Sequence, residues 1–105
     1  MIVTVFRSRL RPEAIAEYTP TAQRMHELAT AMPGYVSHKT FTAEDGERLT
    51  LVEFVDEEAH KAWARHPEHL AAQRVGRERF YSEYRISICQ MLRYNEFPRW
   101  AEGKS

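Results

Sequence analysis

Residues 35 to 55 read YVSHKTFTAEDGERLTLVEFV, and this stretch decides the fold. Two runs rich in β-branched and aromatic residues flank the segment AEDGER, which contains the Asp-Gly pair favoured in tight hairpin turns. The pattern predicts an antiparallel hairpin with one strand on either side of the turn. An isolated hairpin is marginally stable in water, so the flanking segments must supply its core.

The segment before the hairpin predicts a strand and then a helix. Residues 2–11 are rich in β-formers, and Pro12 opens a helix in the first-turn position that proline tolerates. The helix is expected to end at the Pro33-Gly34 pair. Pro20 lies inside it, so we expect a kink or a break at the preceding residue.

The segment after the hairpin predicts two helices and a last strand. Asp56 caps a short helix to about residue 65, a second helix covers 67–80, and a strand covers 81–93. The order is therefore β-α-β-β-α-β. This order predicts an α+β fold of the ferredoxin-like type, an antiparallel sheet with helices on one face.

The predicted strands are apolar on both faces, which indicates a partner. In the last strand, Tyr84, Ile86 and Ile88 lie on one face, and Ser87, Cys89 and Met91 lie on the other. Strands that are apolar on both faces require cover on both, and the helices can cover only one. We therefore expect a second copy of the chain on the other face, as a homodimer.

Length and composition exclude several classes of protein. The 105 residues fit one domain, expected over 1–94, with a tail over 95–105. Fifteen basic residues balance fifteen acidic ones, and the aromatic signature of RNA-binding domains is missing, so no nucleic acid is expected. The single cysteine and a strand-like N-terminus without signal-peptide features favour the cytoplasm. No stretch has the length of a membrane span.

The segment His66-Pro67-Glu68-His69 holds two candidate acid–base residues. Proline pushes His66 into the cap position and leaves His69 in the first turn, where the positive end of the helix disfavours imidazolium. Neutral histidines can act as acid, base or hydrogen-bond partner. The alternative, that His66 merely caps the helix and His69 pairs with a neighbour, stays open. The spacing of three across a helix break does not match zinc helices, so no metal is expected.

The second helix also carries a mixed face. His69, Ala72, Gln73, Gly76 and Phe80 share this face, which fits either a cavity against the sheet or tight packing. Trp63 at the end of the preceding helix fits either a pocket wall or the core.

The chain resembles the antibiotic biosynthesis monooxygenase (ABM) superfamily over roughly residues 2–92. The resemblance rests on MPGYVSHKTF, DGERLTLVEF and EEAHKAWARHPEHLAAQ, in this order and spacing. It implies a dimeric α+β barrel. Some members oxidise phenolic or quinol-type substrates with dioxygen and no cofactor. Others degrade haem with an asparagine on the first strand, a tryptophan near the end of the short helix and a ligating histidine ten residues later.

The residues that match the family argue against haem degradation. Trp63 matches the tryptophan, but Gln73 stands where the histidine is expected, and the first strand VTVFRSRL has no asparagine. The resemblance then leaves two functions and no cofactor. One is a monooxygenase that oxidises a small aromatic substrate, and the other is a small-ligand-binding or stress-related dimer without catalysis.

The predicted site is a pocket between the sheet and the helices. We expect His69, His66 and Trp63 to be catalytic. The residues expected to contact substrate are Gln73, Phe80, His38 and Tyr84.

Overall fold

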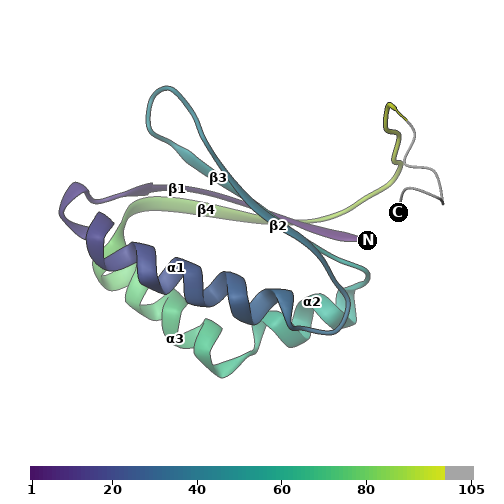
Figure 1. Ribbon diagram of the computed structural model, residues 1–105, viewed down its shortest axis with the longest axis horizontal. Coiled ribbons are helices and arrows are strands. Elements are labelled where there is room, and N and C mark those ends of the chain that lie inside the picture. Colours follow the sequence, from purple (N-terminus) through teal and green to yellow (C-terminus); the bar gives the residue numbers. More distant parts are fainter. Residues whose placement is uncertain (99–105) are drawn as a thin grey trace.

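The computed structural model describes residues 1–98, and its elements follow the predicted order. They are β1 (Ile2–Leu10), η1 (Pro12–Ala14), α1 (Ile15–Thr30), β2 (Tyr35–Thr42), β3 (Arg48–Phe54), α2 (Glu57–Ala64), α3 (Pro67–Val75), η2 (Gly76–Phe80) and β4 (Tyr81–Gln90). All helices lie on one side of the sheet (Figure 1). The predicted α+β, ferredoxin-like fold is confirmed. Residues 99–105 of the predicted tail lie outside the described residues.

The four strands form one antiparallel sheet in the order β2-β3-β1-β4. The predicted hairpin is β2 and β3, and its turn is closed by the amide of Ala43, which donates to the carbonyl of Glu47 at 2.8 Å. Gly46 has a φ of +91°, a conformation that glycine adopts without a steric cost. Asp45 Oδ1 also accepts from the amide of Glu47 at 3.0 Å. The Asp-Gly signal therefore marked the turn correctly.

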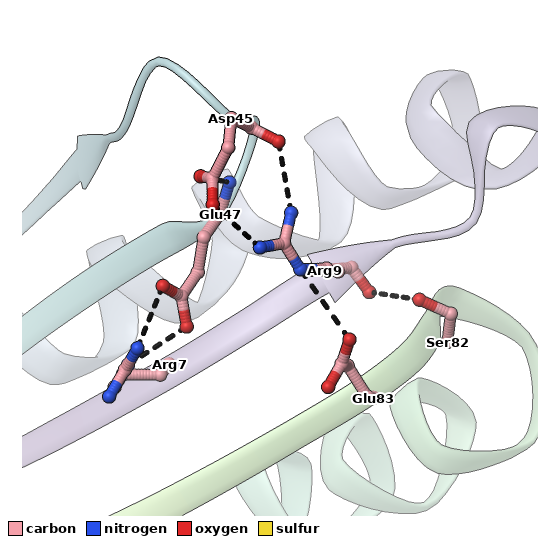
Figure 2. A network of polar contacts seen from close by, with 6 residues as sticks. All are labelled: Arg7, Arg9, Asp45, Glu47, Ser82 and Glu83. Atoms are coloured by element: carbon pink, nitrogen blue, oxygen red, sulfur yellow. Dashed lines mark hydrogen bonds and ion pairs between the residues drawn. The ribbon is translucent and has the colours of Figure 1, made fainter.

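Ion pairs tie the tip of the hairpin to the two neighbouring strands (Figure 2). Arg7 donates through Nε and a terminal nitrogen to both carboxylate oxygens of Glu47, at 2.8 and 2.9 Å. Arg9 reaches Asp45 at 2.8 Å and Glu83 of β4 at 3.4 Å. The guanidinium of Arg7 lowers the pKa of Glu47, and the amide of Glu47 together with Arg9 lowers that of Asp45. These contacts hold three strands in register at this end of the sheet.

The expected break at Pro20 is wrong, because α1 runs continuously through it from Ile15 to Thr30. Proline removes one backbone hydrogen bond, the one that would end on the carbonyl of Ala16. Both Ala16 and Pro20 are exposed, so water can satisfy that carbonyl. One residue earlier, Thr19 Oγ1 donates to the carbonyl of Ile15 at 3.0 Å.

The two helices after the hairpin begin at the predicted caps. Asp56 Oδ1 accepts from the amide of Ala59 at 2.8 Å and starts α2. His66 caps α3, with Pro67 at the first helical position. The predicted helix over 67–80 is present, but its last turn, η2, is widened into a π-helix.

The core of the fold lies between α1, α2 and the centre of the sheet. Ala29, Val52, Phe54 and Trp63 form a buried cluster, with Phe54 completely inaccessible to solvent. No helix within residues 1–98 is long and apolar enough to cross a membrane.

The loop that enters β2 depends on Gly34. Its φ is +83°, and a Cβ at this position would lie 2.6 Å from Cβ of Ala59. We expect Gly34→Ala to lower the free energy of unfolding by about 2–4 kcal/mol, because backbone strain and a clash with a helix combine. Urea denaturation measures the loss. Gly46→Ala is the matched control, since its φ is also positive but nothing lies within 4 Å. Equal losses in the two variants would contradict the clash.

The face of the sheet away from the helices carries a group of partly exposed apolar side chains. The register puts Val3 opposite Cys89 and Val5 opposite Leu51. Leu49 lies on the same face, opposite Arg7. We call this group, Val3, Val5, Leu49, Leu51 and Cys89, the outer face. That a second copy covers it stays a prediction.

Candidate functional site

A cavity of about 400 Å³ lies between the helices and the face of the sheet that they cover. All strands contribute to its wall, together with α1, α2, α3 and η2. All the predicted site residues except His66 line it: His38, Trp63, His69, Gln73, Phe80 and Tyr84. The mixed face of the second helix is therefore the wall of a cavity.

His69 is held in one tautomer by the backbone. Its Nδ1 lies 3.1 Å from the carbonyl oxygen of Trp63, which can only accept, so Nδ1 carries the proton. The remaining nitrogen, Nε2, keeps its lone pair and lies 3.5 Å from the side-chain nitrogen of Gln73. Burial lowers the pKa of His69. Nδ1 is therefore fixed at a carbonyl, and Nε2 is the ring nitrogen that can exchange a proton.

Trp63 supports this base from one side. The His69 and Trp63 rings are stacked, with centroids 4.1 Å apart and planes 13° from parallel. Trp63 is 4% exposed and belongs to the core cluster, so it cannot move away from the imidazole. Both alternatives for Trp63 hold, since the same ring is part of the core and part of the cavity wall.

His66 is not brought into the cavity. Its Nδ1 accepts from the amide of Glu68 at 3.1 Å and so satisfies the first turn of α3. Its ring centroid lies 6.0 Å from that of Trp63, but His66 is not a lining residue. The structure gives His66 the role of a helix cap, the alternative that the sequence left open.

The end of the cavity near η2 is built from aromatic rings. Phe6 lies 5.4 Å from Tyr81 and 5.5 Å from Tyr84, and Tyr18 lies 5.7 Å from Phe80, measured between centroids. Burial, and then the neighbouring phenol of Tyr18, raises the pKa of Tyr81, which therefore stays protonated. This end is therefore largely apolar, with tyrosine hydroxyls as its hydrogen-bond donors.

A Gly76 contact fixes the ring of Tyr81 in this aromatic end. A Cβ at position 76 would lie 2.6 Å from a ring carbon of Tyr81. Only glycine lets the ring pack directly against the helix backbone. The sequence had indicated a close approach at Gly76 but not its partner.

His38 reaches the cavity from β2 as half of a histidine pair. Its Nδ1 lies 2.9 Å from Nδ1 of His26 on α1, a distance that requires a proton on one nitrogen and a lone pair on the other. Burial, and then charge on His26, lowers the pKa of His38. His38 lines the cavity and also a second hollow of about 640 Å³ between α1 and β2. His26 lines this second hollow.

Three lining residues with basic side chains were not predicted from the sequence. His60 of α2 lies with Nε2 3.1 Å from the hydroxyl of Thr4, and its pKa is lowered by burial. Arg48 places its guanidinium carbon 5.3 Å from the centre of the Tyr18 ring. Arg77 lies near the end of α3. Arg48 and Val52 are four residues apart in β3, so their side chains lie on the same, helix-covered face of the sheet. The sequence could therefore have identified Arg48 as a charged residue on that face.

The lining residues do not fit haem or a bound metal ion. Gln73, a poor iron ligand, occupies the position expected for the ligating histidine. Within residues 1–98, no three side chains among His, Cys, Asp and Glu come together as a set of metal ligands. The donor set is suited to proton transfer and to hydrogen bonding.

Comparison with known proteins gives a consistent family. The family described as antibiotic biosynthesis monooxygenase matches residues 1–75. An uncharacterised Bacillus subtilis protein, YqjZ, is 30% identical over 93 residues, which cover 89% of this chain and 82% of YqjZ.

Solved structures share the fold at low sequence identity. Rv0793 from Mycobacterium tuberculosis superposes with a TM-score of 0.80 at 17% identity, covering 90% of this chain and 98% of that one. SnoaB, a cofactor-independent oxygenase from Streptomyces nogalater, gives 0.76 at 17% identity, covering 93% and 97%.

Proposed function

The chain belongs to the antibiotic biosynthesis monooxygenase family, and from this premise we propose that it is a cofactor-independent monooxygenase. Its substrate is a small aromatic compound of the phenol or quinol type, oxidised by dioxygen in the cavity between the sheet and the helices. One observation carries the proposal. His69 is a half-buried imidazole that is stacked on Trp63 and bonded through Nδ1 to its carbonyl, which leaves Nε2, with a long 3.5 Å contact to Gln73, as the proton acceptor.

The reaction starts with proton transfer from the substrate to Nε2 of His69. An activated aromatic such as an anthrone loses a proton to give an anion, and this anion supplies the electrons for dioxygen. The radical pair recombines to a hydroperoxide at the former methylene carbon. Loss of water then breaks the O–O bond and leaves a carbonyl. One oxygen atom enters the product, and the other leaves as water with both methylene hydrogens.

The protein contributes position, a dry cavity and hydrogen bonds to this sequence. Stacking on Trp63 and the bond to its carbonyl hold the base in one orientation, which removes the entropic cost of aligning it. The aromatic end excludes water, which strengthens hydrogen bonds to the developing oxygen anion. Tyr81, kept protonated by burial, is one donor for that anion.

Oxygen uptake is the direct test. The protein is mixed with a panel of anthrones, hydroquinones and catechols in an oxygen electrode, and the products are identified by mass spectrometry with ¹⁸O₂. The expected result is one labelled oxygen in a quinone-type product. The competing function is a small-ligand-binding or stress-related dimer, in which Gln73 keeps Nε2 of His69 permanently engaged. Tight binding of these compounds without oxygen uptake would favour that function.

The pH dependence of the reaction tests the state of the base. Because burial lowers the pKa of His69, the active neutral form persists below the ordinary histidine pKa of about 6.5. We therefore expect kcat/KM to stay constant from pH 8 to below pH 6.5 and to fall only at lower pH. Initial rates between pH 5 and 8 measure this acid limb. A fall centred above pH 6.5 would contradict a desolvated His69.

We also propose that the protein is a homodimer joined through the outer face. Val5 and Leu51 face each other across β1 and β3 on this side, with no helix above them. Burial of such apolar positions is favourable by about 25 cal/mol per Å². A second copy presents the same apolar surface, so a two-fold axis brings the two outer faces together.

A further inference from the structure

The lining of the cavity has a one-sided charge. Two arginines, Arg48 and Arg77, line it and carry the charge, because burial lowers the pKa values of its three histidines, His38, His60 and His69. Of the fifteen acidic residues in the chain, none within residues 1–98 lines this cavity. A concave site with cationic side chains and no carboxylate favours an anionic ligand.

Arg48 is the cation placed to make that contact. Its Nε is buried and has no hydrogen-bond partner within the described part of the chain. Four other arginines differ in this respect, because a carboxylate pairs with each of Arg7, Arg9, Arg24 and Arg79. A buried N–H group without an acceptor is costly, so the site is complete only when an acceptor arrives. Arg48 lines both this cavity and the hollow of about 640 Å³ between α1 and β2, so an acceptor can reach it from either space.

The surroundings of Arg48 strengthen such a contact. The guanidinium lies over the ring of Tyr18, which makes edge-to-face contacts with Phe80 and Tyr81. Aromatic walls lower the local dielectric, and a charge pair gains strength there. Arg48 also lowers the pKa of Tyr81, against the larger effect of burial, so its charge acts inside the cavity.

Arg48 and the base lie toward opposite ends of the cavity. Arg48 and Val52 share one face of β3 four residues apart, a separation of about 13 Å along the strand. Val52 belongs to the cluster of Trp63, on which His69 is stacked. A ligand that contacts both ends is therefore elongated, with an anionic group at one end and a ring at the other.

We propose that the cavity takes an aromatic carboxylic acid, whose carboxylate pairs with Arg48 while its ring lies against Trp63 beside His69. The placement of the reacting ring rests on the proposed function, but the carboxylate contact does not depend on turnover. Guanidinium and carboxylate form two parallel hydrogen bonds, which fix the ligand along the cavity. Arg48 is thus a residue that determines specificity.

Calorimetric titration with two matched probes tests this proposal. The probes are anthraquinone-2-carboxylate and anthraquinone-2-carboxamide, which share size and ring system and differ in charge. We expect the wild-type protein to bind the carboxylate at least about tenfold more tightly than the amide. Arg48→Met should abolish this preference, so that both probes bind with similar affinity. Arg48→Lys should keep part of it, because the charge remains and the paired donors are lost.

The control is Arg74→Met, an exposed arginine of α3 that does not line the cavity, and it should keep the wild-type preference. Equal binding of both probes to the wild type would overturn the proposal. A preference that survives Arg48→Met would overturn the assignment to Arg48. If Arg48→Met binds neither probe, Arg48→Gln replaces it, and its preference must also vanish. If the wild-type protein prefers the carboxylate probe but no substrate causes oxygen uptake, the proposed oxygenase activity is contradicted and the carboxylate contact stands.

Discussion

Replacing His69 by alanine is expected to abolish oxygen consumption, with a fall in kcat/KM of roughly a hundredfold or more. The imidazole Nε2 is the proposed proton acceptor, and within the described residues no carboxylate lines the cavity to replace it. The measurement is initial oxygen uptake with the best substrate of the panel. Unchanged uptake would remove His69 from the mechanism.

Two further variants separate the loss of a base from a loss of structure. His69→Asn keeps a donor for the carbonyl of Trp63 and lacks the basic nitrogen, so we expect the same loss of activity with normal circular dichroism. His66→Ala removes the cap of α3 and should cost about 1 kcal/mol of stability while turnover persists. If His66→Ala instead abolished turnover without unfolding, the sequence prediction of a catalytic His66 would stand.

Placing a charge on the outer face is expected to give a monomer. Leu51→Asp puts a carboxylate next to Val5 at the proposed two-fold interface, and the symmetry repeats the change in both subunits. We expect the dissociation constant to rise by at least about a hundredfold, because an unpaired charge would be buried.

Sedimentation equilibrium at micromolar concentration measures this effect. Leu70→Asp is the matched control, since Leu70 is 49% exposed on α3, away from the outer face, and should leave the dimer intact. A wild-type protein that sediments as a monomer would contradict the homodimer itself. Circular dichroism of Leu51→Asp must show the native fold for the comparison to hold.

Local chemistry predicted most of the fold. The Asp45-Gly46 turn and the caps at Asp56 and His66 are decided by neighbouring residues, so the sequence was sufficient for them. The break expected at Pro20 is absent. That expectation considered the backbone hydrogen bond that proline removes, but not that water can bond to the exposed carbonyl in its place. At an exposed position, the packing of α1 outweighs that loss.

The site was predictable only in part, because its contacts cross elements. Trp63 and His69 are six residues apart in two different helices, and their stacking depends on the angle of the break between them. The His26–His38 pair joins a helix to an edge strand and leaves no trace in sequence spacing. The alternation of side chains along β3 could have placed Arg48 on the face covered by the helices. That its Nε has no hydrogen-bond partner within the described residues could not be predicted from the sequence.

The side of the cavity formed by β4 can change in sequence without disturbing the core. Tyr84, Ile86 and Ile88 line the cavity yet remain 40–50% exposed, and none of them belongs to the buried cluster around Phe54. Substitutions there can reshape the space for a ligand without weakening the packing that stabilises the fold. Substitutions in this one edge strand can therefore change the range of substrates, in nature or in directed evolution, while His69 is retained as the base.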